Sequence, residues 1–408
     1  MEKKKTNRRP TRKRIVEEKK VEKNDDKTEF SLIEVIIIMI ICIVFGLLIG
    51  GYIASQKKYD SNDEHKIDFN EINGLYEDIK NNYYGEYAET SFRDNTVNGM
   101  LSSLKDPYAR LITSEESESY QEELESEFIG IGVTVVMNYD GFPMVNEVFK
   151  ASPAEKSGMK VNDVFVKVDD KDLTGMPMDE VISLIKNGNR GDKVKITVKR
   201  DDKEIDITIS KDIITTPTVS YSIINKEEKK IAKIVICNFS KNTFKEFKDV
   251  YEEIKKEKID GIILDLRGNG GGYLSSAPLV ASMFLDKDKV IYIEKSKDKE
   301  EKIYSKDERV IKEKTVILID GGTASASEIL ASALRINNDV QLVGNTTYGK
   351  NTIQKIHKLK DGALVKFTIG EWFNANEKSI IDEPLHPDIE VTYKDGTDTA
   401  LIEALNLF

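Results

Sequence analysis

The sequence predicts an α/β domain in its C-terminal half, preceded by a smaller β-rich domain, a helical segment and one membrane span. In residues 205–408, apolar runs of four to six residues alternate with amphipathic helical patterns, which is typical of a sheet covered by helices. In residues 126–204, short apolar strands alternate with glycine and Asp-Gly turns. Residues 35–54, VIIIMIICIVFGLLIGGYIA, contain no charged side chain. With 408 residues, the chain is long enough for two or three domains.

The N-terminal end predicts a membrane anchor. Residues 35–54 match the ~20 apolar residues that cross a bilayer, and they exceed the ~7–15 of a signal-peptide core. No A-x-A-like cleavage site ends them, so an uncleaved signal anchor is favoured over a cleaved signal peptide or a buried core helix. The first fourteen residues, MEKKKTNRRPTRKR, contain eight Lys or Arg residues. Because cationic flanks stay inside, we expect residues 1–34 to be a cytoplasmic basic tail and residues 55–408 to lie outside a bacterial cell.

Charge argues against nucleic acid as a partner of the external part. The whole chain has a net charge of −11, and residues 1–30 carry +5 (12 Lys/Arg against 7 Asp/Glu), which leaves −16 for the rest. The two cysteines, Cys42 and Cys237, lie in the span and in a predicted strand, outside any metal-binding or disulfide pattern. We therefore expect no metal and no cofactor.

Residues 55–125 form a polar linker followed by a helical segment. FNEINGLYEDIKNNY and TSFRDNTVNGMLSSL place apolar residues three and four apart, and Asp106-Pro107 interrupts the pattern. An acidic amphipathic run, ITSEESESYQEELESEF, follows. None of these residues suggests chemistry.

The C-terminal domain contains three candidates for buried strands, in the stretches IDGIILDLRG, KTVILID and VQLVG. Helical patterns lie between them, in TFKEFKDVYEEIKK, APLVASMFL and ASEILASALRI. Residues 286–313 are mostly charged around a short VIYIE strand, which predicts an exposed hairpin or excursion.

Several apparent motifs do not predict a site. S-x-x-K occurs at Ser157–Lys160, Ser183–Lys186 and Ser296–Lys299, among other places, as expected by chance in a chain this rich in serine and lysine. GNTTYGKN at 344–351 resembles a phosphate-binding loop, but Asn351 stands where the Mg²⁺-binding hydroxyl is needed. The TIQKIHKL that follows begins with β-branched residues and does not predict the helix that meets the phosphates. Nucleotide binding is therefore disfavoured.

The segment GGTASASEILASAL at 321–334 follows a predicted buried strand and opens a helix. Amides at a helix N-terminus can stabilise an oxyanion, so a serine there is a candidate nucleophile. Local sequence leaves an alternative, because an N-cap is the commonest role of a serine in this position. The chain has three histidines, and none lies in a recognisable catalytic setting.

Three blocks together resemble the active-site blocks of the carboxy-terminal processing (tail-specific) proteases, which are Ser–Lys peptidases with a PDZ domain. The blocks are DGIILDLRGNGGG (260–272), GGTASASEILASAL (321–334) and YGKNTIQ (348–354). The resemblance implies a crotonase- and Clp-protease-like ββα arrangement in a serine peptidase domain at 205–408. The order helical segment, PDZ domain, peptidase domain also matches.

The resemblance assigns a role to each site residue. Ser325 is the implied nucleophile, Lys350 the general base, and Gln354 a supporting residue that orients the lysine amine. The backbone amides of Gly271 and Ala326 are the implied oxyanion hole. Ser327 then points elsewhere and caps the helix, and His357 is the next candidate if the base is not Lys350.

A lysine acts as a base only when it is neutral. Its ordinary pKa is near ~10.4, and desolvation can lower that value by several units. We therefore expect Lys350 in a largely apolar pocket, hydrogen-bonded to the Ser325 hydroxyl.

Residues 126–204 resemble a PDZ domain of the bacterial protease type. The GIGV segment, Gly130, Ile131, Gly132 and Val133, takes the place of the carboxylate-binding loop. Glycines let consecutive amides converge on a carboxylate, so this loop is predicted to bind the free C-terminus of a substrate protein.

Taken together, the sequence predicts a membrane-anchored, outward-facing serine endopeptidase that cleaves proteins near their C-termini. Its PDZ domain is expected to bind the substrate C-terminus and to gate access. The alternative is a PDZ scaffold whose hydrolase domain is inactive. The resemblance also allows a homo-oligomer, for which the sequence contains no interface signature.

Overall fold

The computed structural model describes residues 39, 46, 67–392 and 394–408, and the chain divides into two units after Glu86. The predicted tail and membrane span lie outside the described residues, apart from Met39 and Gly46. Within the part of the chain that is described, no helix is both long enough and apolar enough to cross a bilayer. In the first unit, α2 (Phe69–Asn82) begins at Asp68, whose side chain accepts a hydrogen bond from Asn70 N, and it buries none of its residues.

The helical segment of the second unit contains α3 (Glu89–Ser102), the short strand β1 (Arg110–Ile112) and α4 (Ser114–Glu125). Thr113 and Glu116 form a capping box that starts α4, because each side chain accepts a hydrogen bond from the backbone of the other. Ser126 ends the helix in the left-handed conformation, with φ of 53°. The chain then turns directly into the next strand.

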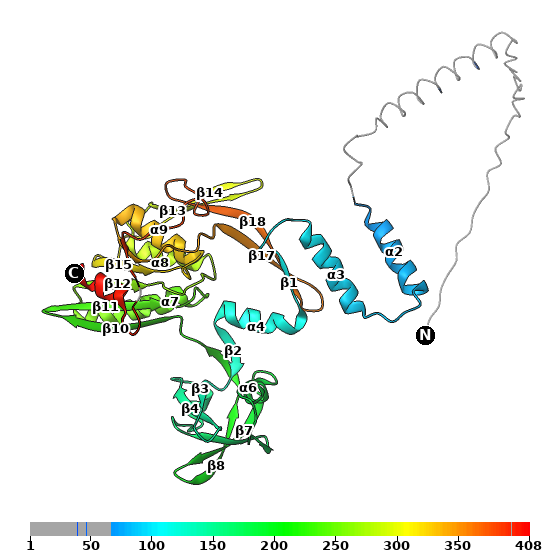
Figure 1. Cartoon of the computed structure of the whole chain (residues 1–408), viewed down its shortest axis with the longest axis horizontal. Coiled ribbons are helices and arrows are strands. Elements are labelled where there is room, and N and C mark those ends of the chain that lie inside the picture. Colours follow the sequence, from blue (N-terminus) through cyan, green and yellow to red (C-terminus); the bar gives the residue numbers. More distant parts are fainter. Residues whose placement is uncertain (1–38, 40–45, 47–66, 393) are drawn as a thin grey trace, which may run out of the picture. The chain divides into compact units, whose positions relative to one another are not determined.

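Two strands connect the β-rich domain to the rest of the second unit. They are β2 (Glu127–Gly130) and β9 (Asp212–Thr215), which pair antiparallel with each other as a separate two-stranded ribbon (Figure 1). We call this ribbon the neck. The chain enters the domain through β2 and leaves it through β9.

The β-rich domain is a five-strand sheet with one short extra strand and two helices. The sheet has the order β3-β4-β5-β7-β8, β6 pairs with β5, and β3 is an edge strand. In its core, apolar residues of the strands pack against Val181 and Ile185 of the longer helix. The elements are β3 (Val133–Met137), β4 (Pro143–Val148), α5 (Pro153–Lys156), β5 (Val164–Val168), β6 (Lys171–Asp172), α6 (Met178–Lys186), β7 (Lys193–Arg200) and β8 (Lys203–Ser210).

The α/β domain is built on a six-stranded sheet with the order β10-β11-β12-β15-β16-β19. β10 runs antiparallel to β11, and every other neighbouring pair is parallel. The strands are β10 (Val219–Lys226), β11 (Lys229–Ile236), β12 (Gly261–Asp265), β15 (Lys314–Ile319), β16 (Gln341–Gly344) and β19 (Ile389–Glu390). The three buried strands predicted from sequence are therefore neighbours, as β12, β15 and β16.

Helices cover both faces of this sheet, because successive strand residues point to opposite sides. Ile262 and Leu264 of β12 pack with α7 (Thr243–Ile254), α8 (Ser276–Phe284) and α9 (Ala326–Asn338), whereas Ile263 packs with α10 (Thr399–Asn406). A short 3₁₀ turn, Lys255–Glu257, follows α7. This three-layer arrangement confirms the predicted α/β class.

A second sheet corrects one expectation from sequence. It has the order β1-β18-β13-β14, with β17 also paired to β18, and its strands are β13 (Val290–Ser296), β14 (Glu300–Tyr304), β17 (Thr352–Lys358) and β18 (Leu364–Asn374). Residues 286–313 were expected to be an exposed hairpin. Instead, Ile291 and Tyr292 of β13 are buried in the main core, because β13 pairs with β18 and packs against α9. The hairpin itself forms, because β13 pairs antiparallel with β14, but only its β14 strand is exposed as expected.

Candidate active site

The three sequence blocks meet at one edge of the main sheet. β12, β15 and β16 are adjacent parallel strands, and their carboxyl ends lead into the glycine loop 268–272, the turn at Ser325 and the loop that carries Lys350. Loops at the carboxyl ends of parallel strands are where α/β folds bind ligands. The topology therefore brings together residues that are far apart in the sequence.

Ser325 occupies a strained backbone position. It stands immediately before α9, with φ of 55° and ψ of −116°, a region that non-glycine residues rarely adopt. Such strain costs of order 1–3 kcal/mol and concentrates at functional sites. Ser327 lies in the first turn of α9 and is fully buried, and its hydroxyl donates to the Asn269 carbonyl at 3.0 Å. The expectation that Ser327 caps the helix is therefore wrong, because its side chain ties the glycine loop to the helix.

Asn269 organises the glycine loop. Its buried side chain donates from Nδ2 to the Ile236 carbonyl at 2.8 Å and accepts a hydrogen bond from the Gly271 amide at 2.9 Å. Its carbonyl accepts hydrogen bonds from Ala324 N and from Ser327 Oγ, both at 3.0 Å. The loop is thus fastened both to β11 and to the turn that carries the candidate nucleophile.

The two implied oxyanion-hole donors differ in this conformation. The Gly271 amide donates to the Asn269 side chain, whereas the Ala326 amide has no backbone or side-chain acceptor within the described residues. Gly271 has φ of 102°, and a Cβ added there would lie 2.9 Å from the Ser325 Cβ. Glycine is therefore required at 271 both for its conformation and for its close approach to Ser325.

Glu328 connects the nucleophile turn to the lysine loop. Its side chain is fully buried and accepts four hydrogen bonds, from Ser325 N at 2.8 Å, Thr347 Oγ1 at 2.6 Å, Gly349 N at 2.8 Å and Lys350 N at 3.0 Å. Burial raises the pKa of the Glu328 carboxyl, and these hydrogen bonds offset part of that effect. Sequence reasoning missed this residue, although a glutamate three positions after a serine at a helix start is a recognised capping signal.

Lys350 lies half-buried, and burial lowers the pKa of its amine. The negative charges of Asp106 and Glu328 act in the other direction and raise that pKa, but burial outweighs them. Its Nζ lies 4.9 Å from the centroid of the Tyr108 ring. Lys350 and Ser325 both belong to the described part of the chain, and no hydrogen bond joins Lys350 Nζ to Ser325 Oγ in this conformation. The expected dyad contact is therefore not formed here, although burial acts on the lysine in the expected direction.

Ser325, Lys350 and Gln354 line one cavity of about 430 Å³, together with the glycine loop. The Gln354 side chain donates from Nε2 to Thr352 Oγ1 at 2.6 Å and does not contact the lysine amine in this state. An adjoining cavity of about 530 Å³ also reaches Ser325, and it has an apolar wall. That wall is formed by Leu124, Tyr273, Leu274, Tyr292, Ile353 and Ile356. His357 lies exposed on β17 and lines neither cavity.

Comparison with known proteins identifies the family. Residues 230–391 match peptidase family S41, residues 130–210 match a PDZ domain, and residues 52–116 match the activating protease CtpB N-terminal domain. The chain is 34% identical over 374 residues to the carboxy-terminal processing protease CtpA of Bacillus subtilis (strain 168), covering 91% of this chain and 78% of that protein. The chain belongs to the carboxy-terminal processing protease family. It is a serine peptidase with a PDZ domain.

A second curated relative agrees with this assignment. The protease is 32% identical over 356 residues to a probable CtpA-like serine protease of Staphylococcus haemolyticus (strain JCSC1435), covering 86% of this chain and 71% of that protein. A solved structure of a photosystem II D1 C-terminal processing protease aligns with a TM-score of 0.46 and 23% identity, covering 78% of this chain and 86% of that chain.

The PDZ domain of the protease has a loop of unpaired amides at residues 130–133. The amides of Ile131 and Gly132 donate to no acceptor among the described residues, while their carbonyls accept hydrogen bonds from Ala154 N and Phe149 N. Gly132 has φ of 83°, and a Cβ there would lie 2.4 Å from the Ser152 Cβ. Val133 begins the edge strand β3, whose outer edge can accept an extended peptide.

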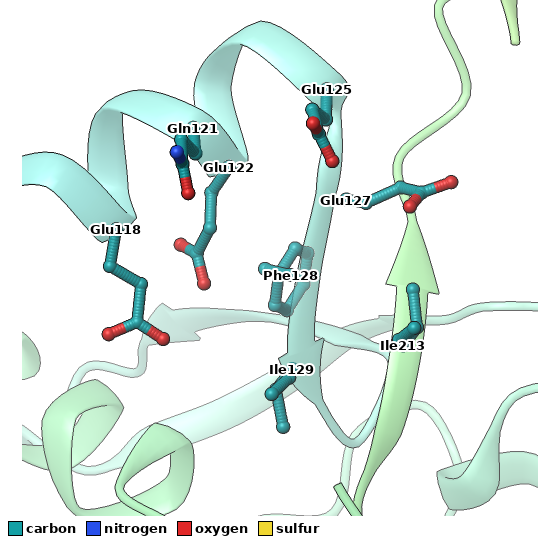
Figure 2. A pocket seen from close by; sticks show the side chains of 8 residues that line it. All are labelled: Glu118, Gln121, Glu122, Glu125, Glu127, Phe128, Ile129 and Ile213. Atoms are coloured by element: carbon teal, nitrogen blue, oxygen red, sulfur yellow. The ribbon is translucent and has the colours of Figure 1, made fainter. Parts of the chain in front are cut away.

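A third, smaller hollow lies between α4 and the neck (Figure 2). Carboxylates of α4 and β2 surround the apolar side chains of Phe128, Ile129 and Ile213 in it. Lys186, at the end of α6, forms an ion pair with Glu122 of α4, and its Nζ lies 4.9 Å from the Phe128 ring centroid. Helix α4 is thus attached to the PDZ helix by one side.

The other side of α4 lines the cavity of about 430 Å³. Tyr120, Glu123 and Leu124 of α4 share that cavity with Ser325. The free thiol of Cys237, at the end of β11, is also a lining residue, which sequence reasoning did not place there. A lone cysteine in a strand gives no local signal of such a position.

Proposed function

We propose that the protease is a single-span membrane protein whose external peptidase domain cleaves protein substrates near their C-termini through a Ser325–Lys350 dyad. The strained backbone of Ser325 is the observation that carries this proposal. That backbone turns the side chain of Ser325, and not that of Ser327, into the cavity that Lys350 also lines. The Ser327 hydroxyl is buried and already donates a hydrogen bond.

The chemistry follows from these positions. Neutral Lys350 takes the hydroxyl proton of Ser325 as the oxygen attacks a peptide carbonyl, and the resulting ammonium then protonates the leaving amine. A water molecule then hydrolyses the acyl-enzyme, losing a proton to Lys350 as it attacks, and Lys350 returns that proton to Ser325 Oγ. For the first step, the Lys350 side chain must leave the Tyr108 ring and reach Ser325 Oγ. Gln354 orients the amine once it is there.

The Ala326 amide is the first donor of the proposed oxyanion hole, because it is unpaired at the N-terminus of α9. Gly271 supplies the second donor when its amide exchanges the Asn269 side chain for the oxyanion. Two amides at this position stabilise the negative charge that develops on the carbonyl oxygen.

The PDZ loop at Gly130, Ile131, Gly132 and Val133 binds the free C-terminal carboxylate of the substrate in this proposal. The unpaired amides of Ile131 and Gly132 support that role. Helix α4 carries the gating, since one side pairs with Lys186 of the PDZ domain and the other lines the catalytic cavity. A peptide that moves α6 therefore also moves the wall of the cavity.

Anchoring and assembly are further parts of the proposal. The apolar segment 35–54, preceded by a basic tail, supports an N-terminus inside the cell and a peptidase domain outside. Protease added to intact cells should then degrade the PDZ domain and spare an N-terminal tag, and protection of the PDZ domain would exclude this topology. Exposed apolar residues of α2, including Phe69, Ile72 and Leu75, support a homo-oligomer.

Single substitutions test the dyad in the full-length protein with an unfolded protein substrate. Ser325→Ala and Lys350→Ala should each abolish cleavage, and Lys350→Arg should do the same because a guanidinium stays protonated. Ser327→Ala serves as the matched control, with an expected loss of no more than about tenfold, the equivalent of one buried hydrogen bond.

Two outcomes would contradict the mechanism. One is a folded Lys350→Arg protein with normal activity, which would place the base elsewhere and make His357 the next candidate. The other is an inactive Ser327→Ala protein beside an active Ser325→Ala protein. A wild-type protein that binds C-terminal peptides without cleaving any protein would favour the inactive scaffold.

A further inference from the structure

The side chain of Lys350 contacts a turn from a distant part of the chain. Residues 106–109 lead into β1, which pairs with β18 in the second sheet. This turn brings the Tyr108 ring under Lys350 Nζ, at 4.9 Å from the ring centroid. A cation at that distance from an aromatic face is attracted by the ring quadrupole, and a neutral amine is not.

Asp106 adds a fixed negative charge beside the lysine. Its carboxylate accepts hydrogen bonds from Thr368 N at 2.8 Å and from Tyr108 N at 3.0 Å, so β18 and the turn itself hold it in place. Partial burial opposes ionisation of Asp106, but these hydrogen bonds outweigh it and lower the pKa of the carboxyl. Asp106 is therefore charged at neutral pH, and it favours the protonated form of Lys350.

Other charged and titratable groups also face this region. Glu328 of α9 acts on Lys350 in the same direction as Asp106. Lys366 of β18 also faces this region, and the charge of Lys350 helps to lower the pKa of its amine. Lys366 and Arg110 lie over the Tyr120 ring of α4, at 5.8 and 5.4 Å from its centroid.

Two more residues complete the surroundings of Lys350. Tyr348, in the lysine loop, interacts with the Tyr108 hydroxyl and helps to fix that ring. The thiol of Cys237 and the carboxylate of Glu123 line the same cavity. Among all these groups, only the Tyr108 ring and Asp106 are contributed by the turn at 106–109.

We propose that Asp106 and Tyr108 are positioning residues that hold the protonated side chain of Lys350 away from Ser325 and set the pH at which it becomes available as a base. This inference rests on the proposed dyad. When Lys350 is charged, its ammonium stays over the Tyr108 ring, near Asp106. When Lys350 loses its proton, that attraction disappears, and the neutral amine is free to accept a hydrogen bond from Ser325 Oγ.

The pH dependence of kcat/KM in the full-length protease tests the inference. Cleavage should rise with pH as Lys350 loses its proton. Tyr108→Leu removes the aromatic face and should move the midpoint of that rise to lower pH, by about 0.4 to 1.5 units for a cation–π contact. Tyr108→Phe keeps the face and should leave the midpoint in place. Asp106→Asn removes a charge that favours the ammonium and should also move the midpoint to lower pH.

Asp361→Asn is the matched control for charge. Asp361 is a carboxylate in the turn between β17 and β18, where it pairs with Arg93. Its removal should not move the midpoint. Thermal unfolding of every variant separates loss of fold from a shifted profile. If Asp106→Asn does not fold, the Leu and Phe variants of Tyr108, a half-buried residue, decide the question.

A second readout does not depend on activity. In the Ser325→Ala full-length protein, the rate at which an amine-acylating reagent labels Lys350, followed by mass spectrometry, measures the neutral fraction at each pH. Adding Tyr108→Leu or Asp106→Asn should lower the labelling midpoint, whereas Tyr108→Phe and Asp361→Asn should not. Unchanged midpoints in folded Tyr108→Leu and Asp106→Asn proteins would overturn the inference. If the labelling midpoint shifts in these variants but the wild-type protein has no peptidase activity, the positioning of Lys350 is upheld and the proposed dyad is rejected.

Discussion

Replacing Glu328 with alanine removes the acceptor of four hydrogen bonds at once. Three of the donors are the backbone amides of Ser325, Gly349 and Lys350, which cannot turn to other acceptors, and the fourth is the rotatable hydroxyl of Thr347. A buried donor left without an acceptor costs about 1–3 kcal/mol. Because water can enter the space that the side chain vacates, we take the lower end of this range, about 1 kcal/mol, for each of the three amides. The expected loss in the free energy of unfolding is therefore about 3 kcal/mol.

The same substitution loosens both members of the proposed dyad. The Glu328 carboxylate fixes the backbone at Ser325 and at Lys350, and a displacement of about 1 Å at reacting groups can cost about 10²-fold in rate. We therefore expect a fall in kcat of at least about tenfold. Glu328→Gln should lose less stability, since one amide oxygen still accepts hydrogen bonds, although its NH₂ group then faces donors.

The chain contains a suitable reporter for this test. Trp372 is its single tryptophan, it is fully buried in β18, and its indole donates to the Lys350 carbonyl at 3.0 Å. Denaturant titration of the full-length protein followed by tryptophan fluorescence therefore reports on the peptidase domain. Glu300→Ala, which removes an exposed carboxylate paired with Lys295, should change stability by less than about 0.5 kcal/mol. A Glu328→Ala protein as stable and active as this control would refute the reasoning.

Three further predictions concern the glycines, the control serine and pH. Gly132→Val places a side chain on Ser152 and should weaken binding of C-terminal peptides at least tenfold by calorimetry, and equal binding of amidated peptides by the wild type would contradict carboxylate capture. Ser327→Ala removes the hydrogen bond to Asn269 and should cost about 1 kcal/mol of stability, checked by the same fluorescence titration. Because burial lowers the pKa of Lys350, the rise of kcat/KM with pH should be centred below the ordinary value of a lysine, and a midpoint above it would be inconsistent.

The sequence by itself determined the class of each domain and the order in which they occur. Periodicity was sufficient for β12, β15 and β16, because strands buried on both faces are continuous apolar runs that stand out from their surroundings. The blocks around Ser325 and Lys350 were also recognisable, since glycine and small residues are needed at fixed positions where backbones approach closely. Local sequence left open which serine of the pair carries the chemistry.

Only the tertiary structure decided how these blocks are held and what completes them. Glu328 gained four partners because the fold places the lysine loop beside the start of α9, and no local pattern records that proximity. The turn at Asp106 and Tyr108 suggested no chemistry in a helical segment, yet pairing of β1 with β18 brings it to Lys350. The charged stretch at β13 became part of the core for the same reason. Long-range strand pairing assigns the last two positions, because Arg110 pairs with Lys366 and Tyr292 pairs with Asn374.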